Sequence, residues 1–426
     1  MYDTLINRIK TDDNDEAAFL ELGNRLILSG NFTGLTEILT YRAARGKSGS
    51  ALAFELCRQL ILKGELEAVL KISSCFGDLS PFSAAFYCAR SFVHFARFDH
   101  ITGTVCLREG TRRLYLLADQ YPSETLAPLF QASMFQISFL FDPPAGEPKV
   151  NDEIPDLAIL HHGAGDRCKG VSAAFGDSRY FQSYAARLAQ TFFSHSGPGN
   201  GLFIGIINPD ADALGLAQAL SLRHPALTIA TTRYNGDLLP EYCCSARFLF
   251  ANRLLNMFNA PLVLFDIDNS FSDGCAKVLN IIRTFPLSYV RTQDIWPHLM
   301  ISAAVVGAHP GPSSEKFFGR IASYVRTKIN ETGPLWAYDQ VALYQAIASL
   351  RRDGDDITNV NAILPNQFRL PDFFTGDHVL LLEDRRKTRS NENMVLVGIG
   401  ADLKPIYAKL APTAAPPHQQ WRMAVR

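Results

Sequence analysis

Two aspartates, Asp266 and Asp268, have the clearest chemical potential in this sequence. They end the segment Pro261-Leu-Val-Leu-Phe-Asp-Ile-Asp-Asn-Ser270, in which an apolar run leads into Asp-x-Asp. Residues i and i+2 of a strand face the same way, so the run predicts a buried strand that presents two carboxylates at its carboxyl end. Two such carboxylates repel each other unless a cation lies between them, and hard oxygen ligands suit Mn²⁺ or Mg²⁺. The alternative is a strand followed by an Asx-rich turn.

Short apolar runs alternate with helical patterns around these aspartates. Runs 169–175, 201–207, 227–231 and 261–265 predict strands, and segments 180–194, 211–223 and 241–258 predict helices. This alternation predicts an α/β domain with a mostly parallel sheet, in which ligands bind at the carboxyl ends of the strands. The segment around His161 and His162, ahead of these strands, is expected to be a loop.

Residues 16–140 show a different pattern, because apolar side chains recur there at helical spacing. The leucines, the isoleucine and the glycine of segment Glu21 to Gly30 recur in Glu55 to Gly64, at an offset of 34 residues. A third, degenerate copy occupies residues 85–98. This is the period of tetratricopeptide repeats, in which leucines fill the groove between paired helices and glycine ends the first helix. Two unrelated amphipathic hairpins are the alternative.

The composition describes a globular protein and excludes several function classes. The 426 residues are 47% hydrophobic and 19% charged, with a formal net charge of −1. No general field therefore attracts the chain to nucleic acid or to anionic lipid. There is no apolar run of membrane-spanning length, no signal-like start, and no disulfide or zinc pattern among the eight cysteines. We expect a cytoplasmic protein without a transmembrane segment.

The chain is predicted to be multidomain. A helical, tetratricopeptide-like domain is expected over residues 1–145, an α/β domain over 146–384, and a peripheral segment with a loose tail over 385–426. The boundary near residue 145 follows from a stretch rich in proline and glycine at 142–148.

Four local patterns in the second half together resemble the GT-A fold of nucleotide-sugar glycosyltransferases, a Rossmann-related α/β fold. The nearest members are glycogenin-like and lipopolysaccharide galactosyltransferase-like enzymes. The patterns are Val171-Ser-Ala-Ala-Phe175 followed by Gly-Asp177-x-x-Tyr180, the helix-forming segment that holds Arg247, Leu264-Phe-Asp266-Ile-Asp268, and Trp336-Ala-Tyr-Asp339-Gln340. They occur in the order that the family shows, over about residues 168–350.

The resemblance implies an activity and a role for each matched residue. The chain would move a hexose from a nucleotide-diphosphate donor, UDP-linked by resemblance, to a saccharide, lipid-linked or protein acceptor, with retention of configuration. Because stacked repeats leave a concave face free, the helical half is expected to bind the acceptor or a protein partner. The implied sites are Asp177 and Tyr180 for the base, Arg247 for the nucleotide, Asp266 and Asp268 for Mn²⁺ or Mg²⁺, and Asp339 and Gln340 for catalysis at the sugar end.

The chain departs from the family pattern at two places. Ser302-Ala-Ala-Val305 stands where the family has an Asn-Ala-Gly-Val-like segment, which makes Ser302 the candidate sugar contact. The family's His-x-x-Gly-x-x-Lys motif is missing, and His378 is the candidate for the third metal ligand.

Two other functions are consistent with the sequence. The run ending in Asp266-x-Asp268 also resembles the nucleophile motif of haloacid-dehalogenase-like phosphatases, with Asp266 as nucleophile and Asp268 as acid and base. Lys316 and Gly354-Asp355-Asp356 would be the later motifs, although three predicted strands precede Asp266 where that family has none. The second alternative is a non-catalytic binding protein that combines tetratricopeptide-like repeats with a GT-A-like domain.

Overall fold

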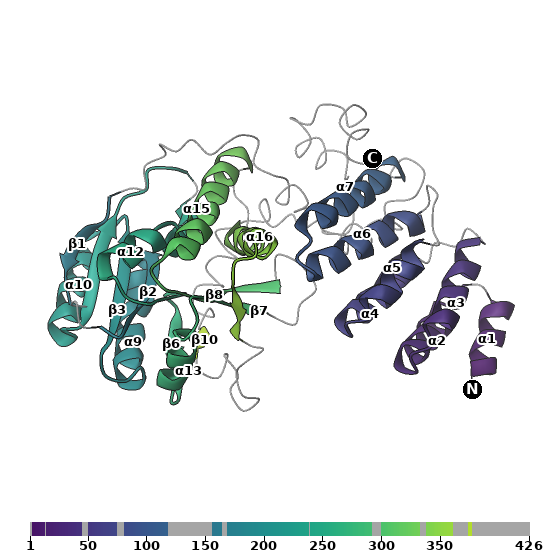
Figure 1. Cartoon of the computed structure of the whole chain (residues 1–426), viewed down its shortest axis with the longest axis horizontal. Helices are drawn as coiled ribbons and strands as arrows, with labels where there is room; N and C mark the ends of the chain where they lie inside the picture. Colours follow the sequence, from purple (N-terminus) through teal and green to yellow (C-terminus); the bar gives the residue numbers. More distant parts are fainter. Residues whose placement is uncertain are drawn as a thin grey trace. The chain divides into compact units, whose positions relative to one another are not determined.

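The computed structural model describes residues 2–12, 14–44, 50–74, 81–117, 156–163, 168–237, 239–291, 300–332, 338–360 and 374–376 (Figure 1). The chain divides into two compact units. The first holds the described residues up to 117 except 98–100, and the second holds 98–100 and the described residues from 156 onward. The predicted boundaries at 145 and 384 lie outside the described residues.

The described residues of the first unit are helical. Its elements are α1 (Tyr2–Thr11), α2 (Glu16–Leu28), α3 (Phe32–Ala44), α4 (Ser50–Leu62), α5 (Leu66–Ser74), α6 (Pro81–Ala96) and α7 (His100–Leu117). Helix α1 packs on α2, α2 on α3, α4 on α5 and α5 on α6. In addition, α2 packs on α4 and α4 on α6. Gly23 on α2 leaves room for the side chain of Leu56 on α4, because an added Cβ would lie 2.6 Å from it.

The turns between these helices repeat with the period seen in the sequence. Gly30 and Gly64 both have left-handed backbone, with φ of +69° and +78°. The amide of the following residue bonds back into the preceding helix at both turns, Asn31 to the Leu26 carbonyl and Glu65 to the Leu60 carbonyl, each at 2.9 Å. Phe98 has the same left-handed backbone (φ +61°) one period later. The helical prediction is thus confirmed for these residues, and assignment to the tetratricopeptide class stays a prediction.

The second unit is built on a mixed eight-stranded sheet. Its strands are β1 (Ala158–His161), β2 (Gly170–Asp177), β3 (Asn200–Ile207), β4 (Leu227–Thr232), β5 (Leu262–Phe265), β7 (Leu287–Arg291), β8 (Ile301–Ala308) and β9 (Thr358–Asn359), in the order β1-β4-β3-β2-β5-β8-β7-β9. The four strands β4-β3-β2-β5 are parallel, as predicted. Strands β1, β5, β8 and β7 add antiparallel pairings at the two sides. A separate two-stranded sheet joins β6 (Asn269–Phe271) to β10 (Phe374–Gly376).

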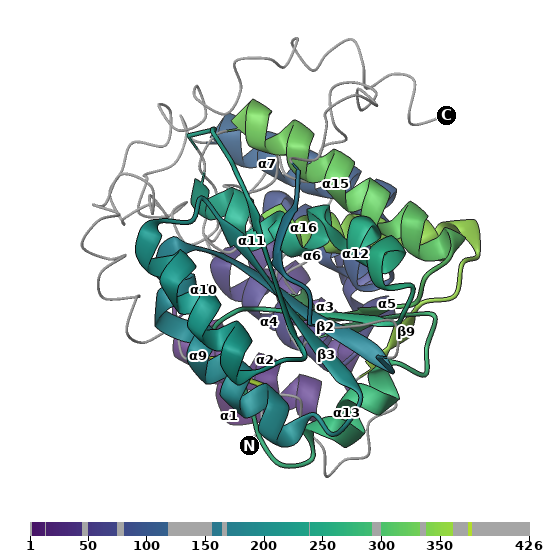
Figure 2. The ribbon, with the colours of Figure 1, turned by 90° about the vertical axis from the view of Figure 1, so that its left-hand side faces the viewer.

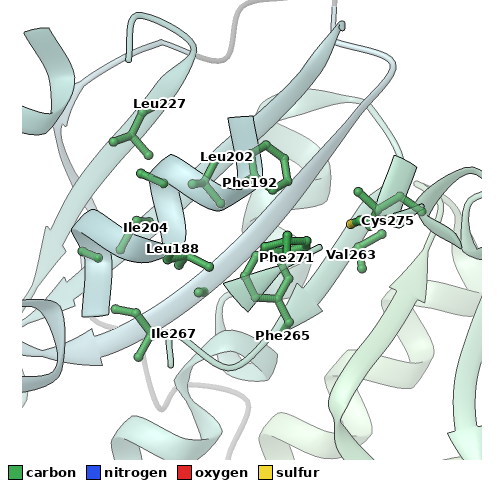
Figure 3. Close-up of a cluster of buried hydrophobic side chains, with 14 of the residues drawn as sticks. Leu188, Phe192, Leu202, Ile204, Leu227, Val263, Phe265, Ile267, Phe271 and Cys275 are labelled. Carbon is green, nitrogen blue, oxygen red and sulfur yellow. The ribbon is translucent and has the colours of Figure 1, made fainter. Parts of the chain in front are cut away.

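Helices cover both faces of the large sheet (Figure 2). One face carries α9 (Ser178–His195), α10 (Ala211–Arg223) and α13 (Cys275–Ile282), and the other carries α11 (Leu239–Leu249), α12 (Ala251–Phe258), α15 (Pro312–Thr332) and α16 (Tyr338–Asp353). On the first face, Leu188 and Phe192 of α9 pack against Leu202, Val263 and their neighbours on the strands (Figure 3). Full burial of these apolar side chains is the main force that holds the strands under the helices.

Two local predictions were wrong. The segment before β2 is a strand where a loop was expected: β1 pairs antiparallel with β4, Ala158 opposite Thr231, and ends at His161. The predicted helix 241–258 is two helices, because the chain breaks at Phe250. The break lets the Phe250 ring stack on Phe175 of β2, with centroids 5.1 Å apart and planes 9° apart.

Within the part of the chain that the structure describes, no helix combines the length and the apolar character needed to cross a membrane.

Candidate functional site

The parallel strands bring several sequence-predicted residues to one edge of the sheet. Strand order reverses at β2, with β3 on one side and β5 on the other, and such a reversal opens a crevice at the carboxyl ends of the strands. Asp177 is the last residue of β2, and Asp266 follows the last residue of β5. The carboxyl edge at β2 and β5 is therefore the candidate functional site.

Arg247 is the centre of this site. Its side chain is only 4% exposed. Nη1 lies 2.7 Å from Oδ1 of Asp266, and Nη2 lies 3.3 Å from Oδ2 of Asp339. Nη2 also donates to the carbonyl of Ala303 at 3.0 Å. One guanidinium thus joins three of the four segments that carry the resemblance, although sequence reasoning assigned it to the nucleotide.

Electrostatics keep this guanidinium charged. Burial by itself lowers the pKa of Arg247, but the surrounding carboxylates, Asp266 and Asp339 foremost, outweigh burial and raise that pKa above its ordinary value. Asp268 adds a smaller contribution that also raises the pKa of Arg247. Burial raises the pKa of Asp339, against the opposing effects of Arg247 and of the amide of Gln340.

The two aspartates of the Asp-x-Asp motif are not on a strand, which corrects the local prediction. Strand β5 ends at Phe265, and a turn follows, closed by the amide of Asn269 donating to the carbonyl of Asp266 at 3.2 Å. The Asx-rich turn was the alternative. Asp266 is accessible, with 33% of its side chain exposed, whereas Asp268 is buried.

Ile267, between the two aspartates, anchors this turn. Its side chain is buried in the core cluster beneath the sheet edge (Figure 3). It packs over the backbone of Gly176 in β2, where an added Cβ would lie 3.1 Å from Cδ1 of Ile267 and 3.1 Å from Cβ of Tyr180. Gly176 therefore permits the turn and the start of α9 to approach each other, and sequence reasoning did not single it out.

Asp177 and Tyr180 lie beside this contact. The Asp177 carboxylate caps α9 by accepting the amide of Tyr180 at 2.8 Å, which satisfies an otherwise unpaired helix amide. Tyr180 is half-buried, and its ring lies 5.6 Å from that of Tyr184. The cap gives Asp177 a structural role, and Tyr180 keeps part of its surface exposed at the edge.

The catalytic candidates begin α16. Asp339 is the second residue of that helix, and its Oδ1 accepts the amide of Gln340 at 2.8 Å. The carboxylate thus faces Arg247 with one oxygen and the helix start with the other. Gln340 is half-buried beside it.

Several buried polar atoms at the site have no hydrogen-bond partner among the described residues. They belong to Arg247 or to residues one or two positions from the cluster: Arg247 Nε, Ser245 Oγ, Asn269 Nδ2 and Gln340 Oε1. Buried polar groups are nearly always paired with protein, water or a ligand. Similar atoms occur elsewhere among the described residues, so at this site they show only that hydrogen-bonding capacity is left beside Arg247.

Ser302 lies at the margin of the site. It is on β8, half-buried, and its Oγ accepts the amide of Ala304 at 3.2 Å. Val305 is the partner of Phe265, so the residues before Val305 lie alongside the turn that follows β5. The next residue, Ala303, supplies the carbonyl that binds Arg247. A backbone acceptor of this kind carries no side-chain signal in the sequence.

His378 lies outside the described residues. The described strand β10 constrains the chain before it, because Gly376 pairs with Asn269, the residue directly after Asp268.

The carboxylates of the site are chemically suitable ligands for a divalent cation. Asp266 and Asp268 supply hard oxygen atoms, and Asp266 is exposed enough to be reached from solvent. Among the described residues, no group of three or more metal-ligating side chains comes together. A cation here would thus take further ligands from substrate phosphates, from water or from the undescribed part of the chain, as Mg²⁺ commonly does.

The residues that the phosphatase alternative requires lie elsewhere. Lys316 pairs with Asp355 at 2.8 Å and with Asp353 at 2.7 Å. This cluster joins the start of α15 to the end of α16, and α15 follows the end of β8, which pairs with the beginning of β5. It therefore lies at the opposite edge of the sheet from Asp266. His309 is at that edge too, with Nε2 2.5 Å from the carbonyl of Arg283.

No family model matches the sequence, and no curated protein matches it. Among solved structures, the apo structure of the bifunctional glycosyltransferase WbbM is similar at a TM-score of 0.34 and 14% sequence identity. The match covers 46% of this chain and 39% of that chain. A similarity of this size supports no inference about fold or activity.

Proposed function

We propose that this protein is a metal-dependent glycosyltransferase that moves a sugar from a nucleotide-diphosphate donor, UDP-linked by resemblance, to an acceptor hydroxyl. The observation that carries the proposal is the ion-pair cluster at the sheet edge. Arg247 joins Asp266 of the Asp-x-Asp motif to Asp339 of the Asp-Gln motif, residues far apart in sequence. The sequence resemblance assigned these segments to a single site, and the contact is what such a site requires.

The proposed roles follow from the chemistry of the bond that breaks. The leaving diphosphate gathers negative charge, and Mn²⁺ or Mg²⁺ neutralises it as a Lewis acid. Asp266 and Asp268 would hold that ion, with His378 as the candidate third ligand. Asp339 would support the positive charge that develops at the anomeric carbon, and Gln340 would orient the sugar.

Other residues would orient the donor. Tyr180 offers an aromatic face to the base, and Asp177 would accept a hydrogen bond from the base in addition to capping α9. Ser302 would contact the sugar from β8. We propose a saccharide, lipid-linked or protein acceptor, with the helical unit as the docking surface for the acceptor or for a protein partner, because stacked helical repeats leave a concave face free. Retention of configuration and a cytoplasmic location also belong to this proposal.

The direct test is hydrolysis of nucleotide sugars by the purified protein. We expect release of nucleoside diphosphate from at least one UDP-sugar when Mn²⁺ is added, and none in chelator. Asp268→Asn should abolish the release, while Asp3→Asn, an equal charge change on an exposed residue of the first unit, should not. Phosphate release from simple monoesters instead would favour the phosphatase alternative, and no reaction with any donor would favour a binding protein.

A further inference from the structure

Asp266 has a cationic partner in the chain itself, at the position where the proposed function needs it to hold a metal ion. The Nη1 to Oδ1 distance of 2.7 Å is that of a charge-assisted hydrogen bond. Because the Arg247 side chain is only 4% exposed, this bond is poorly screened by water. Any cation that binds Asp266 through the same oxygen must compete with the guanidinium.

The guanidinium can lose Asp266 without becoming an unpaired buried charge. Nη2 keeps the Ala303 carbonyl at 3.0 Å and Asp339 at 3.3 Å. The planar group also lies over the Phe248 ring, 4.6 Å from its centroid. An unpaired buried guanidinium would be strongly destabilising, whereas this one retains its anchors.

The formal charge of the cluster favours such an exchange. Three carboxylates, those of Asp266, Asp268 and Asp339, act on the single guanidinium of Arg247. With all three carboxylates ionised, these four side chains together carry a formal charge of −2, which one divalent cation would balance.

We infer that Arg247 is an internal counter-ion that Asp266 exchanges for the metal ion, so that metal binding is weak until a donor diphosphate arrives. This inference rests on the proposed function. The diphosphate adds ligands for the cation and new acceptors for the freed Nη1, and both favour the exchange. Arg247 is then a positioning residue: it keeps the site closed to free cations and couples Asp266 to Asp339.

The test measures Mn²⁺ binding by electron paramagnetic resonance on the full chain, with and without UDP. Wild type should bind Mn²⁺ weakly alone and at least about tenfold more tightly with UDP. Arg247→Met should bind Mn²⁺ alone at least about tenfold more tightly than wild type, the effect of one removed charge at close range. UDP should then add little. Arg247→Lys, which keeps the charge but cannot bond two carboxylates as a planar fork, should lie between them.

A double variant distinguishes the direct Arg247–Asp266 contact from the long-range electrostatic effect of the Arg247 charge. In an Asp266→Asn background, Arg247→Met should no longer tighten Mn²⁺ binding, because the competing bond is already absent. If Arg247→Met tightened Mn²⁺ binding equally in both backgrounds, the exchange would be overturned. Long-range repulsion between Arg247 and the metal ion would then explain the effect. Thermal unfolding identifies any variant that fails to fold, and Arg247→Lys then decides the question.

The inference and the proposed function fail in different ways. Wild-type affinity for Mn²⁺ that is tight and independent of UDP would overturn the exchange and leave a metal-dependent transferase intact. The absence of Mn²⁺ binding under all conditions would overturn both.

Discussion

Helix α16 has an ion cluster near each end, and the two clusters differ in burial and in charge balance. Near its start, Asp339 meets the buried Arg247, where carboxylates outnumber the cation. At its end, Asp353 and the nearby Asp355 face the partly exposed cations Lys316, Arg320 and Arg352. The helix has 16 residues, so it separates the clusters by about 20 Å at 1.5 Å per residue.

The comparison shows that aspartates and basic residues have different effects at the two ends of α16. Exposed ion pairs are screened by water and add little to stability, and in this cluster each charge has a partner of opposite sign. The cluster at the end of α16 therefore links α15 to α16. A buried cluster with excess negative charge is costly unless something balances it. Of these two clusters, the one at the start of α16 has the buried guanidinium, and it lies at the carboxyl edge of the sheet where the candidate site was placed.

The largest expected effect is the loss of catalysis in Asp268→Asn. The substitution keeps the shape and removes a charged metal ligand, so transition-state stabilisation falls by several kcal/mol. Turnover should drop at least about 10²-fold. The matched change at the other cluster, Asp355→Asn, should leave turnover within about twofold, since exposed pairs contribute little. Equal losses of turnover in Asp268→Asn and Asp355→Asn would show that the two clusters do not differ in function.

Asp339→Ser should lose most transfer while keeping the fold. Serine suits the start of a helix, and Arg247 retains Asp266 and the Ala303 carbonyl. The melting temperature should therefore stay close to that of wild type, while transfer falls at least about tenfold because the negative charge at the sugar end is gone. Full activity in the serine variant, with UDP binding unchanged, would reduce Asp339 to a helix-capping residue.

Gly176→Val tests how the site depends on close packing beneath it. A side chain at position 176 would press on Ile267 and on Tyr180, so the free energy of unfolding should fall by about 1–3 kcal/mol. Displacement of the turn should also weaken Mn²⁺ binding in the presence of UDP. Gly215→Val on α10 is the matched control, because an added Cβ there meets no atom within 4 Å. Unimpaired Mn²⁺ binding in Gly176→Val would show that the turn does not need this support.

The smallest effect is a pH response of opposite sign at the two ends of α16. Hydrogen bonds from Lys316 and Arg320 lower the pKa of Asp353 from 3.8 to about 2. Its stabilisation is therefore complete above pH 3.8 and is lost as the pH falls through 2. The raised pKa of Asp339 acts the other way, and stability falls as the pH rises above 3.8 towards that pKa.

Thermal unfolding of wild type and Asp353→Asn between pH 2 and 5 measures the first of these responses. The wild-type advantage should shrink as the pH falls from 3.8 towards 2. A constant difference over this range would show that the exposed cluster does not clasp the helices. Asp339→Asn should gain stability relative to wild type as the pH rises above 3.8.

Much of the fold could be predicted from local pattern. Continuous apolar runs identified the parallel strands β2 to β5 because strands buried on both faces need no alternation. The 34-residue period of the helical half is also present in the structure, because Gly30 and Gly64 both have left-handed backbone. The pattern failed at β1, whose short exposed strand is held by pairing with β4 rather than by its own burial.

The site could be predicted only in part. Spacing indicated Asp266 and Asp268, but it could not show that a turn rather than a strand presents them, since Asp and Asn suit both. The partners of Arg247 come from segments up to 92 residues away, and no local signal reports such contacts. Gly176 contributes by having no side chain, and Ala303 contributes through its backbone carbonyl. Composition and residue spacing cannot detect either contribution.

The pairing of β6 with β10 has a consequence for synthesis of the protein. Asn269, beside the Asp-x-Asp turn, finds its strand partner in Gly376. Those two residues are about a hundred positions apart, which is roughly 5–20 s of translation at the usual rates. During that interval β6 emerges from the ribosome with an unpaired edge next to Asp266 and Asp268, and unpaired edges attract other strands. A nascent chain halted before residue 374 should therefore bind chaperones at β6 and release them once β10 appears.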